Sequence, residues 1–164
     1  MLERWLHIDL STQQLQLREG EERLFEASIS SAKNGPGEQH GSGCTPRGWH
    51  VIRACIGEGH AAGTVFVARR PTGEIYSPAL ASAAPQRDWI LSRILWLSGL
   101  EPGRNRLGKV DTMRRFIYLH GCPDELPMGV PLSHGCIRMR NDDIIRLYEM
   151  VGAGTRVLIE ESAN

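Results

Sequence analysis

Strict alternation of apolar and polar residues near the N-terminus is the feature that most constrains this chain. In RWLHIDL (residues 4–10) and QLQLREG (14–20), apolar residues recur at every second position on either side of a turn at 11–14. Successive side chains of a β-strand point to opposite faces, so this period indicates strands with one buried face. The sequence therefore predicts a β-hairpin, followed by a third strand in RLFEASISSAK (23–33).

Later segments repeat this strand character between clusters of turn-forming residues. Residues 34–48, NGPGEQHGSGCTPRG, are rich in Gly, Pro and Ser and are expected to form an irregular loop. A turn is predicted in RPTGE (70–74). Further strands are predicted at 49–57, 63–70, 75–80, 114–121 and 155–161.

One segment with helical periodicity lies in residues 87–103. Its apolar side chains recur at spacings of three and four, and Gly99 and Pro102 mark its end. This pattern predicts a helix that packs on the core; the alternative is a helix that lines a groove beside an active site. The apolar residues concerned are Trp89, Ile90, Leu91, Ile94, Leu95 and Leu97.

A second helix is predicted from residue 141 onwards. Asn141 is its expected N-cap, the acidic pair Asp142 and Asp143 complements the helix dipole, and Gly152 is its stop. The result is a strand-dominated chain with two helices. A length of 164 residues fits a single domain spanning 1–164.

Charge and hydropathy exclude some classes of partner. Lys+Arg and Asp+Glu balance at 19 each, so we expect no nucleic acid. No apolar run approaches the roughly 20 residues that span a bilayer, so we expect no membrane contact. The N-terminus lacks the apolar core of a signal peptide, which predicts a cytoplasmic protein, or a periplasmic one if an export signal is missing from this sequence. The four cysteines have irregular spacing and do not form a disulfide scaffold.

Two histidines and two cysteines gather in the last third of the chain, as H-x-C pairs at 120–122 and 134–136. Two interpretations compete. Zinc takes four thiolate and imidazole ligands, and the two pairs could supply all four, although H-x-C is tighter than the usual ligand spacing. Alternatively, one cysteine is a nucleophile activated by a histidine. Gly135 beside Cys136 would let the backbone approach a substrate carbonyl, and the amide N–H groups there could meet a developing oxyanion.

The segment HGCPDELPMGVPLSHGCIRMRN (120–141) resembles the signature of the L,D-transpeptidase (YkuD-like) catalytic domain. That signature is His-Gly, a spacer of about a dozen residues, and then Ser/Thr-His-Gly-Cys, an apolar residue and Arg. Residues 133–138 match it without a gap, and the upstream segments 45–52, 92–106 and 114–121 also resemble the family. The resemblance favours catalysis over zinc binding. It implies a mainly β fold, a sandwich or barrel-like core with a few short α-helices.

The resemblance also implies a role for each matched residue. Cys136 would be the nucleophile and His120 the general base and acid, oriented by the backbone carbonyl of Gly121. The backbone of His134, Gly135 and Cys136 would form the oxyanion hole and shape the pocket. Ser133 would anchor the loop or the substrate, with a plain turn hydroxyl as the alternative, and Arg138 would anchor the loop or contact a substrate carboxylate. No metal and no cofactor are implied.

The implied reaction cleaves the L,D bond between diaminopimelate and the terminal D-Ala of a peptidoglycan stem tetrapeptide, through a Cys thioester. The expected partners are peptidoglycan tetrapeptide fragments (muropeptides). The absence of an export signal favours an L,D-carboxypeptidase of peptidoglycan recycling; the alternative is an L,D-transpeptidase that forms crosslinks. A zinc-stabilised, non-catalytic binding module is the third possibility.

Several residues near the signature are given lesser roles. Cys122 replaces the Ser or Thr of many relatives, and packing is its expected role, with a tuned base or a reversible disulfide to Cys136 as alternatives. Arg140 is assigned to the surface. The histidines outside the signature, His7, His40, His50 and His60, are expected to be structural or solvent-facing.

Overall fold

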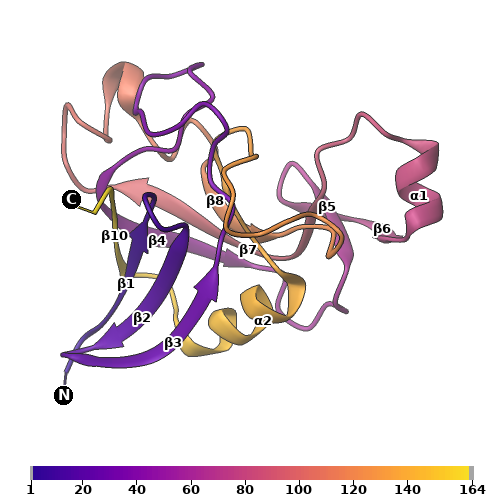
Figure 1. Ribbon diagram of the computed structural model, residues 1–164, viewed down its shortest axis with the longest axis horizontal. Coiled ribbons are helices and arrows are strands. Elements are labelled where there is room, and N and C mark those ends of the chain that lie inside the picture. Colours follow the sequence, from indigo (N-terminus) through magenta and orange to yellow (C-terminus); the bar gives the residue numbers. More distant parts are fainter. Residues whose placement is uncertain (1, 163–164) are drawn as a thin grey trace.

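The strands of this protein join into one ten-stranded mixed sheet, which strongly bends around its core (Figure 1). The structure is a computed structural model and describes residues 2–162. Eight strands follow one another in the order β3-β2-β1-β10-β4-β7-β5-β6, while β8 pairs with β7 and β9. The strands are β1 (Arg4–Asp9), β2 (Gln14–Glu19), β3 (Glu22–Ser28), β4 (Gly48–Ile56), β5 (Thr64–Val67), β6 (Arg70–Ile75), β7 (Ile90–Gly99), β8 (Tyr118–Gly121), β9 (Ile137–Met139) and β10 (Arg156–Glu160).

Two short α-helices accompany the sheet, α1 (Pro78–Ala83) and α2 (Asn141–Met150), with one 3-10 turn at Gly108–Val110. The expectation of a mainly β protein with a few short helices is therefore confirmed. Within residues 2–162, neither helix has the length and apolar character needed to cross a membrane.

The N-terminal meander agrees with the alternating sequence pattern. β2 pairs antiparallel with both β1 and β3, as the predicted hairpin and third strand require. The apolar positions Leu6, Ile8, Leu15 and Leu17 are fully buried, because the period of two places them all on the core face. β10 lies between β1 and β4, so the last strand joins the meander to the rest of the sheet.

The predicted helix at residues 87–103 is wrong: this segment is the central strand β7. β7 pairs with β4, β5 and β8, and both of its faces are covered, so its apolar residues do not need to alternate. A continuous apolar run in a doubly buried strand imitates spacings of three and four. A β-bulge at Ser92, whose φ is +71°, further disturbs the period.

Several predicted element boundaries differ from those in the structure. Two of them lie in the segment of β6 and α1, which is set apart from the rest of the molecule in Figure 1. The predicted turn at 70–74 is strand β6, and the strand predicted at 75–80 instead leads into α1, whose N-cap is Ser77. The predicted strand at 114–121 begins only at Tyr118, because Phe116 takes a left-handed conformation with φ of +57°. Residues 34–48 form the irregular loop that was expected.

Asn141 is not the N-cap of α2, which is a second correction. Arg140 holds that position and makes no side-chain capping bond, while Asn141 is the first helical residue and is buried. Its amide contacts residues outside the helix instead of the helix N–H groups. Ile144 and Leu147 of α2 pack into the main core, so the helix closes one side of the sheet next to β7 and β8.

Candidate active site

A cavity of about 510 Å³ lies where β8 ends and the loop before β9 passes beside it. The sequence-predicted residues His120, Ser133, His134, Cys136 and Arg138 all line this cavity. β8 and β9 run parallel and adjacent, so residues sixteen positions apart in the chain reach the same cavity. Gly121 and Gly135, the remaining sequence-predicted residues, are chain neighbours of His120 and Cys136 but are not among the residues that line the cavity.

His120 is held in a fixed orientation by β8. The strand is buried between β7 and β9, and the ring is only 1% exposed. Its Nδ1 lies 2.7 Å from the carbonyl oxygen of Gly121, and a carbonyl only accepts hydrogen bonds. Nδ1 therefore carries the proton and Nε2 has the free lone pair, as a base requires. Burial lowers the pKa of His120, which keeps the ring neutral.

Gly121 lies in a place that admits no side chain. A Cβ there would lie 2.5 Å from Asn141 Oδ1 and 2.5 Å from the carbonyl oxygen of Leu91. The Asn141 amide thus packs directly on the backbone that orients His120. It donates to the carbonyl of Cys122 at 2.9 Å and accepts from Ser92 Oγ at 2.5 Å. Sequence reasoning treated Asn141 as a helix cap and missed this contact.

Cys136 is half-buried at the edge of the same cavity. Its Sγ donates to the carbonyl of Phe116 at 3.3 Å and accepts from the backbone N–H of Tyr118 at 3.3 Å. Burial raises the pKa of the Cys136 thiol to about 12, and the Tyr118 N–H only partly offsets this. These pKa shifts favour a neutral thiol and a neutral imidazole in the cavity, so that proton transfer would accompany attack of this thiol on a substrate.

The loop before β9 is shaped by the hydroxyl of Ser133. This buried side chain donates to the carbonyl of Cys136 at 2.5 Å and accepts from the N–H of Gly135 at 3.2 Å. Gly135 has φ of +134°, a conformation that favours glycine. Its N–H is thus occupied, whereas the N–H groups of His134 and Cys136 have no partner within residues 2–162. Those two amides are the ones available to an oxyanion.

Arg138 contacts both the loop and a carboxylate that the sequence did not single out. Its Nη1 donates to the carbonyl of Leu132 at 3.3 Å, and its Nη2 lies 3.3 Å from Asp88 Oδ1. Asp88 is the one carboxylate among the lining residues that the structure describes, against the guanidinium groups of Arg69, Arg115 and Arg138. The walls are therefore cationic and suit an anionic ligand. No motif signalled Asp88, which fell inside the wrongly predicted helix.

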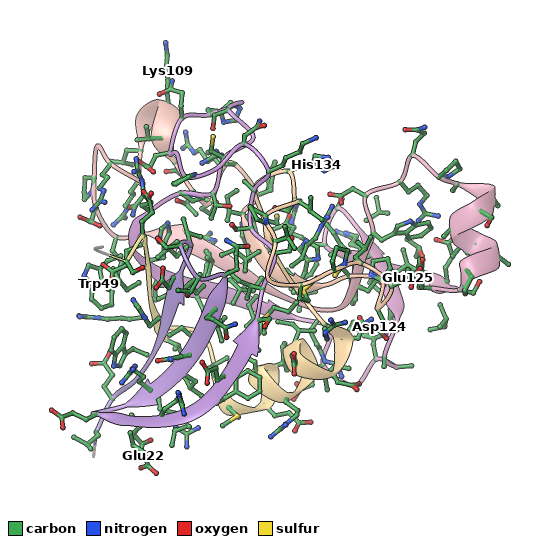
Figure 2. All side chains as sticks on the ribbon, viewed as in Figure 1. Glu22, Trp49, Lys109, Asp124, Glu125 and His134 are labelled. Atoms are coloured by element: carbon green, nitrogen blue, oxygen red, sulfur yellow. The ribbon has the colours of Figure 1, made fainter. Side chains whose placement is uncertain are left out.

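Cys122 lies outside this cavity, and His134 lines its rim with a mostly exposed side chain. Cys122 is buried with its Sγ 3.5 Å from the carbonyl of Met139, burial raises its pKa to about 11, and it does not line the cavity. The His134 side chain is 78% exposed and projects from the loop (Figure 2). Among residues 2–162, no three His, Cys, Asp or Glu side chains group as metal ligands, so the four ligands of the zinc interpretation do not converge. All four cysteines are free.

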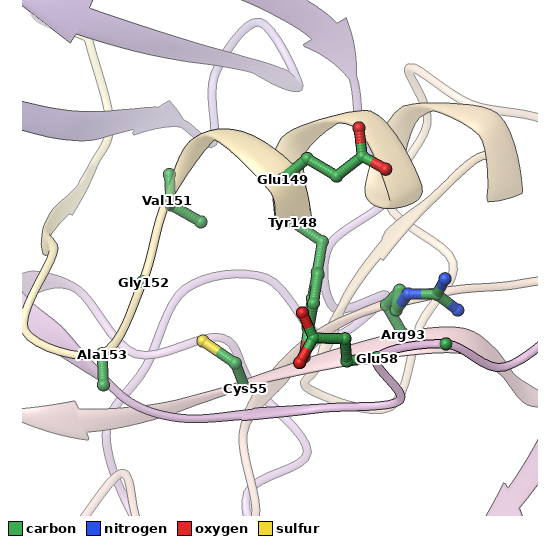
Figure 3. A pocket seen from close by; sticks show the side chains of 9 residues that line it. Cys55, Glu58, Arg93, Tyr148, Glu149, Val151, Gly152 and Ala153 are labelled. Atoms are coloured by element: carbon green, nitrogen blue, oxygen red, sulfur yellow. The ribbon is translucent and has the colours of Figure 1, made fainter.

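Two further cavities help to define the surroundings. One of about 400 Å³ shares Asp88, His134 and Arg138 with the 510 Å³ cavity and is also lined by Trp89 and Tyr76. Another, of about 640 Å³, lies between the end of α2 and the β4–β5 turn, where Tyr148 faces Cys55, Glu58 and Arg93 (Figure 3). It contains none of the sequence-predicted site residues.

Arg140 was predicted to lie on the surface and His50 to be structural or solvent-facing, and the structure agrees with both predictions. Arg140 is exposed. His50 is fully buried between the carbonyl of Gly48 and the hydroxyl of Thr112, at 3.0 and 2.9 Å, and burial lowers its pKa to about 4.

Comparison with known protein families and with curated proteins finds related sequences. A family model described as the L,D-transpeptidase catalytic domain (YkuD) matches residues 3–159. The putative L,D-transpeptidase YqjB of Bacillus subtilis is 43% identical over 47 residues, which make up 29% of this chain and 27% of that protein.

Solved structures are similar over almost the whole chain. Bdellovibrio bacteriovorus Bd1075 has a TM-score of 0.62 at 18% identity, covering 99% of this chain and 50% of that one. L,D-transpeptidase 3 from Mycobacterium tuberculosis, in complex with a faropenem-derived adduct, has a TM-score of 0.59 at 14% identity, covering 98% and 61%. At these identities the likeness establishes the fold alone. The chain spans less than two thirds of the length of each of these relatives.

Proposed function

This chain belongs to the YkuD family of L,D-transpeptidase catalytic domains, a family of cysteine enzymes, and from that premise we propose that Cys136 carries acyl groups of peptidoglycan stem peptides. The observation that carries the proposal is the meeting of Cys136 and His120 in one cavity, with His120 Nδ1 bound to Gly121 so that Nε2 is free to accept a proton.

In the proposed first step, Cys136 Sγ attacks the carbonyl on the diaminopimelate side of the L,D bond. His120 Nε2 takes the thiol proton as the S–C bond forms, because the thiol itself is neutral at rest. The tetrahedral oxyanion accepts from the backbone N–H groups of His134 and Cys136. The C–N bond then breaks, His120 returns the proton to the leaving amine, and D-Ala departs from a thioester.

The charge of the cavity supports a substrate with carboxylates. Arg69, Arg115 and Arg138 line it with one opposing carboxylate, Asp88. A stem tetrapeptide carries several carboxylates, including that of its terminal D-Ala. Arg138 is bonded directly to the catalytic loop through the carbonyl of Leu132, and it pairs with Asp88 at 3.3 Å.

The acyl group is proposed to leave on an amine of a second stem peptide, which gives a crosslink. The adjoining cavity of about 400 Å³ favours this outcome, because it shares Asp88, His134 and Arg138 with the catalytic cavity and has room for an acceptor. Hydrolysis by water, the L,D-carboxypeptidase reaction expected from the sequence, is the second candidate. The relative YqjB is named as a transpeptidase and gives the hydrolytic branch no support.

A single assay tests the acyl-enzyme and its fate together. The protein is incubated with a diaminopimelate-containing tetrapeptide, with and without an acceptor peptide, and the products are weighed by mass spectrometry. Transfer predicts a crosslinked dimer, whereas hydrolysis predicts tripeptide and free D-Ala. Cys136→Ala should form neither, and Cys122→Ala, whose thiol lies outside the cavity, should give the same products as wild-type protein.

A penem provides an independent check of the nucleophile. Because a faropenem-derived adduct occurs on the M. tuberculosis relative, faropenem is expected to add its mass to this protein at Cys136. Wild-type protein that gives no peptide product and no adduct would refute the proposal.

A further inference from the structure

We propose that Thr45 is a positioning residue that aims the Cys136 amide at the reaction oxyanion; this inference rests on the proposed function of Cys136. Thr45 lies in the irregular loop 34–48, ninety positions before Gly135, and is fully buried. Its hydroxyl donates to the carbonyl of Gly135 at 2.9 Å. Thr45 begins the segment 45–52 that resembles the family, but the sequence analysis gave it no role.

The direction of this hydrogen bond is fixed by the surroundings of Thr45. Its Oγ1 also accepts from the backbone N–H of Ala32 at 2.9 Å, and that N–H can only donate. The one hydroxyl proton therefore goes to Gly135. Both ends of the hydroxyl are used, so its rotation is restricted.

The Gly135 carbonyl and the Cys136 N–H belong to one peptide unit. The described residues contain no cis peptide bond, and in a planar trans unit the C=O and N–H point in opposite directions. A carbonyl drawn inward to buried Thr45 thus turns the Cys136 N–H away from the interior. That N–H has no partner within residues 2–162, and Cys136 lines the cavity. An unpaired amide is tolerated where water or a ligand reaches it.

Thr45 is itself held rigidly. Its N–H donates to Gly35 at 3.1 Å, and its carbonyl accepts from Gly37 at 2.9 Å. The guanidinium of Arg115 donates to the carbonyl of the preceding residue, Cys44, at 2.6 Å. A Cβ on Gly135 would lie 3.3 Å from that same carbonyl, so the loop packs closely against the catalytic backbone.

A second hydroxyl controls the next peptide unit. Ser133 Oγ donates to the carbonyl of Cys136 at 2.5 Å. Peptide units on both sides of Cys136 are therefore oriented by hydroxyl groups, one from the catalytic loop and one from a distant loop. Of these two hydroxyl groups, that of Thr45 orients the peptide unit that carries the Cys136 N–H, which is one of the two proposed oxyanion donors.

The test compares two reactions of the same thiol. Acylation by p-nitrophenyl acetate forms a tetrahedral oxyanion, whereas alkylation by iodoacetamide forms none; both need the proton of Cys136 removed. Thr45→Val keeps the shape of the side chain without its hydroxyl, and Thr45→Ser keeps the hydroxyl. Because an activated ester needs no stem peptide, failure of the tetrapeptide assay leaves this test intact.

Removal of one oxyanion donor lowers the rate by about 10²–10³-fold. In Thr45→Val the donor remains but is less well oriented, so we expect the kcat of acylation to fall by about 10–100-fold. KM and the alkylation rate should stay within about twofold, and Thr45→Ser should retain the acylation rate within about threefold. Equal acylation rates in Thr45→Val and Thr45→Ser, or a parallel fall of acylation and alkylation, would overturn the inference. Thr45→Ala provides the same comparison if Thr45→Val does not fold.

Discussion

The Nδ1 atom of His120 lies 2.7 Å from the carbonyl oxygen of Gly121, which fixes the proton on Nδ1 and leaves Nε2 as the acceptor. Burial lowers the pKa of His120 below its ordinary value of about 6.5. His120 cannot act as a base once it is protonated, so activity should fall only at pH values below the ordinary histidine pKa. We expect kcat/KM for acylation to decline with a midpoint below pH ~6.5. A midpoint above it would contradict this picture.

Alkylation of Cys136 should show a different dependence on pH. Burial raises the pKa of its thiol to about 12, so the thiolate population keeps growing with pH. The rate of reaction with iodoacetamide should still be rising at about pH 9, as mass spectrometry can follow. A plateau reached below about pH 8 would instead indicate a preformed thiolate–imidazolium pair.

Replacement of the base should slow acylation without unfolding the protein. His120→Gln removes the Nε2 lone pair, and general-base catalysis contributes about 10²–10⁴-fold to rate. We expect a fall of that size in kcat/KM, measured with p-nitrophenyl acetate. His60→Gln is the matched control, since His60 is exposed and lies outside the cavity. Equal rates in the two variants would remove His120 from the mechanism.

Gly121 should tolerate no side chain. An alanine Cβ would lie 2.5 Å from Asn141 Oδ1 and from the backbone oxygen of Leu91, which cannot move away easily. We expect Gly121→Ala to lower the free energy of unfolding by about 1–3 kcal/mol or more, as overpacking does. Gly152→Ala meets no atom within 4 Å and should be neutral or stabilising. Urea denaturation of both variants provides the comparison.

Loss of the Asn141 side-chain amide should destabilise the protein more than loss of an exposed side chain in the first turn of the same helix. Asn141→Ala removes the donor to the carbonyl of Cys122 and the acceptor of the Ser92 hydroxyl proton. Buried groups that lose a hydrogen bond cost about 1–3 kcal/mol. The exposed neighbour Asp142 contributes mainly to the helix dipole, so Asp142→Ala should cost less than about 1 kcal/mol. Equal costs in thermal or urea unfolding would show that Asn141 acts only through the helix.

His50 should make the protein less stable in acid. Burial lowers its pKa to about 4 in the folded state, whereas the unfolded chain binds the proton near pH 6.5. The neutral ring thus stabilises the fold fully above about pH 6.5, and that contribution is lost as pH falls toward 4. We expect up to about 3 kcal/mol of unfolding free energy to disappear over this window. His50→Gln should flatten the dependence, and an unchanged slope would refute it.

The strands that could be predicted from sequence are those with one solvent-facing side. β1 and β2 alternate because only one face meets the core, so Leu6, Ile8, Leu15 and Leu17 could be assigned correctly. β7 could not, because it is covered on both faces and its apolar run has no period of two. The same error hid Asp88, which precedes β7 and reaches the catalytic cavity.

The family and the chemical groups of the candidate site could be read from the sequence, because the histidine and its glycine at the end of β8 and the cysteine and its glycine just before β9 form a motif of characteristic spacing. Tertiary structure alone decided how those groups are aimed. Thr45 donates to the carbonyl of Gly135 and Asn141 to that of Cys122, both from distant positions in the chain, and Ser92 in turn donates to the Asn141 amide oxygen. The direction of such a bond depends on where the folded chain places donor and acceptor, which no local pattern encodes.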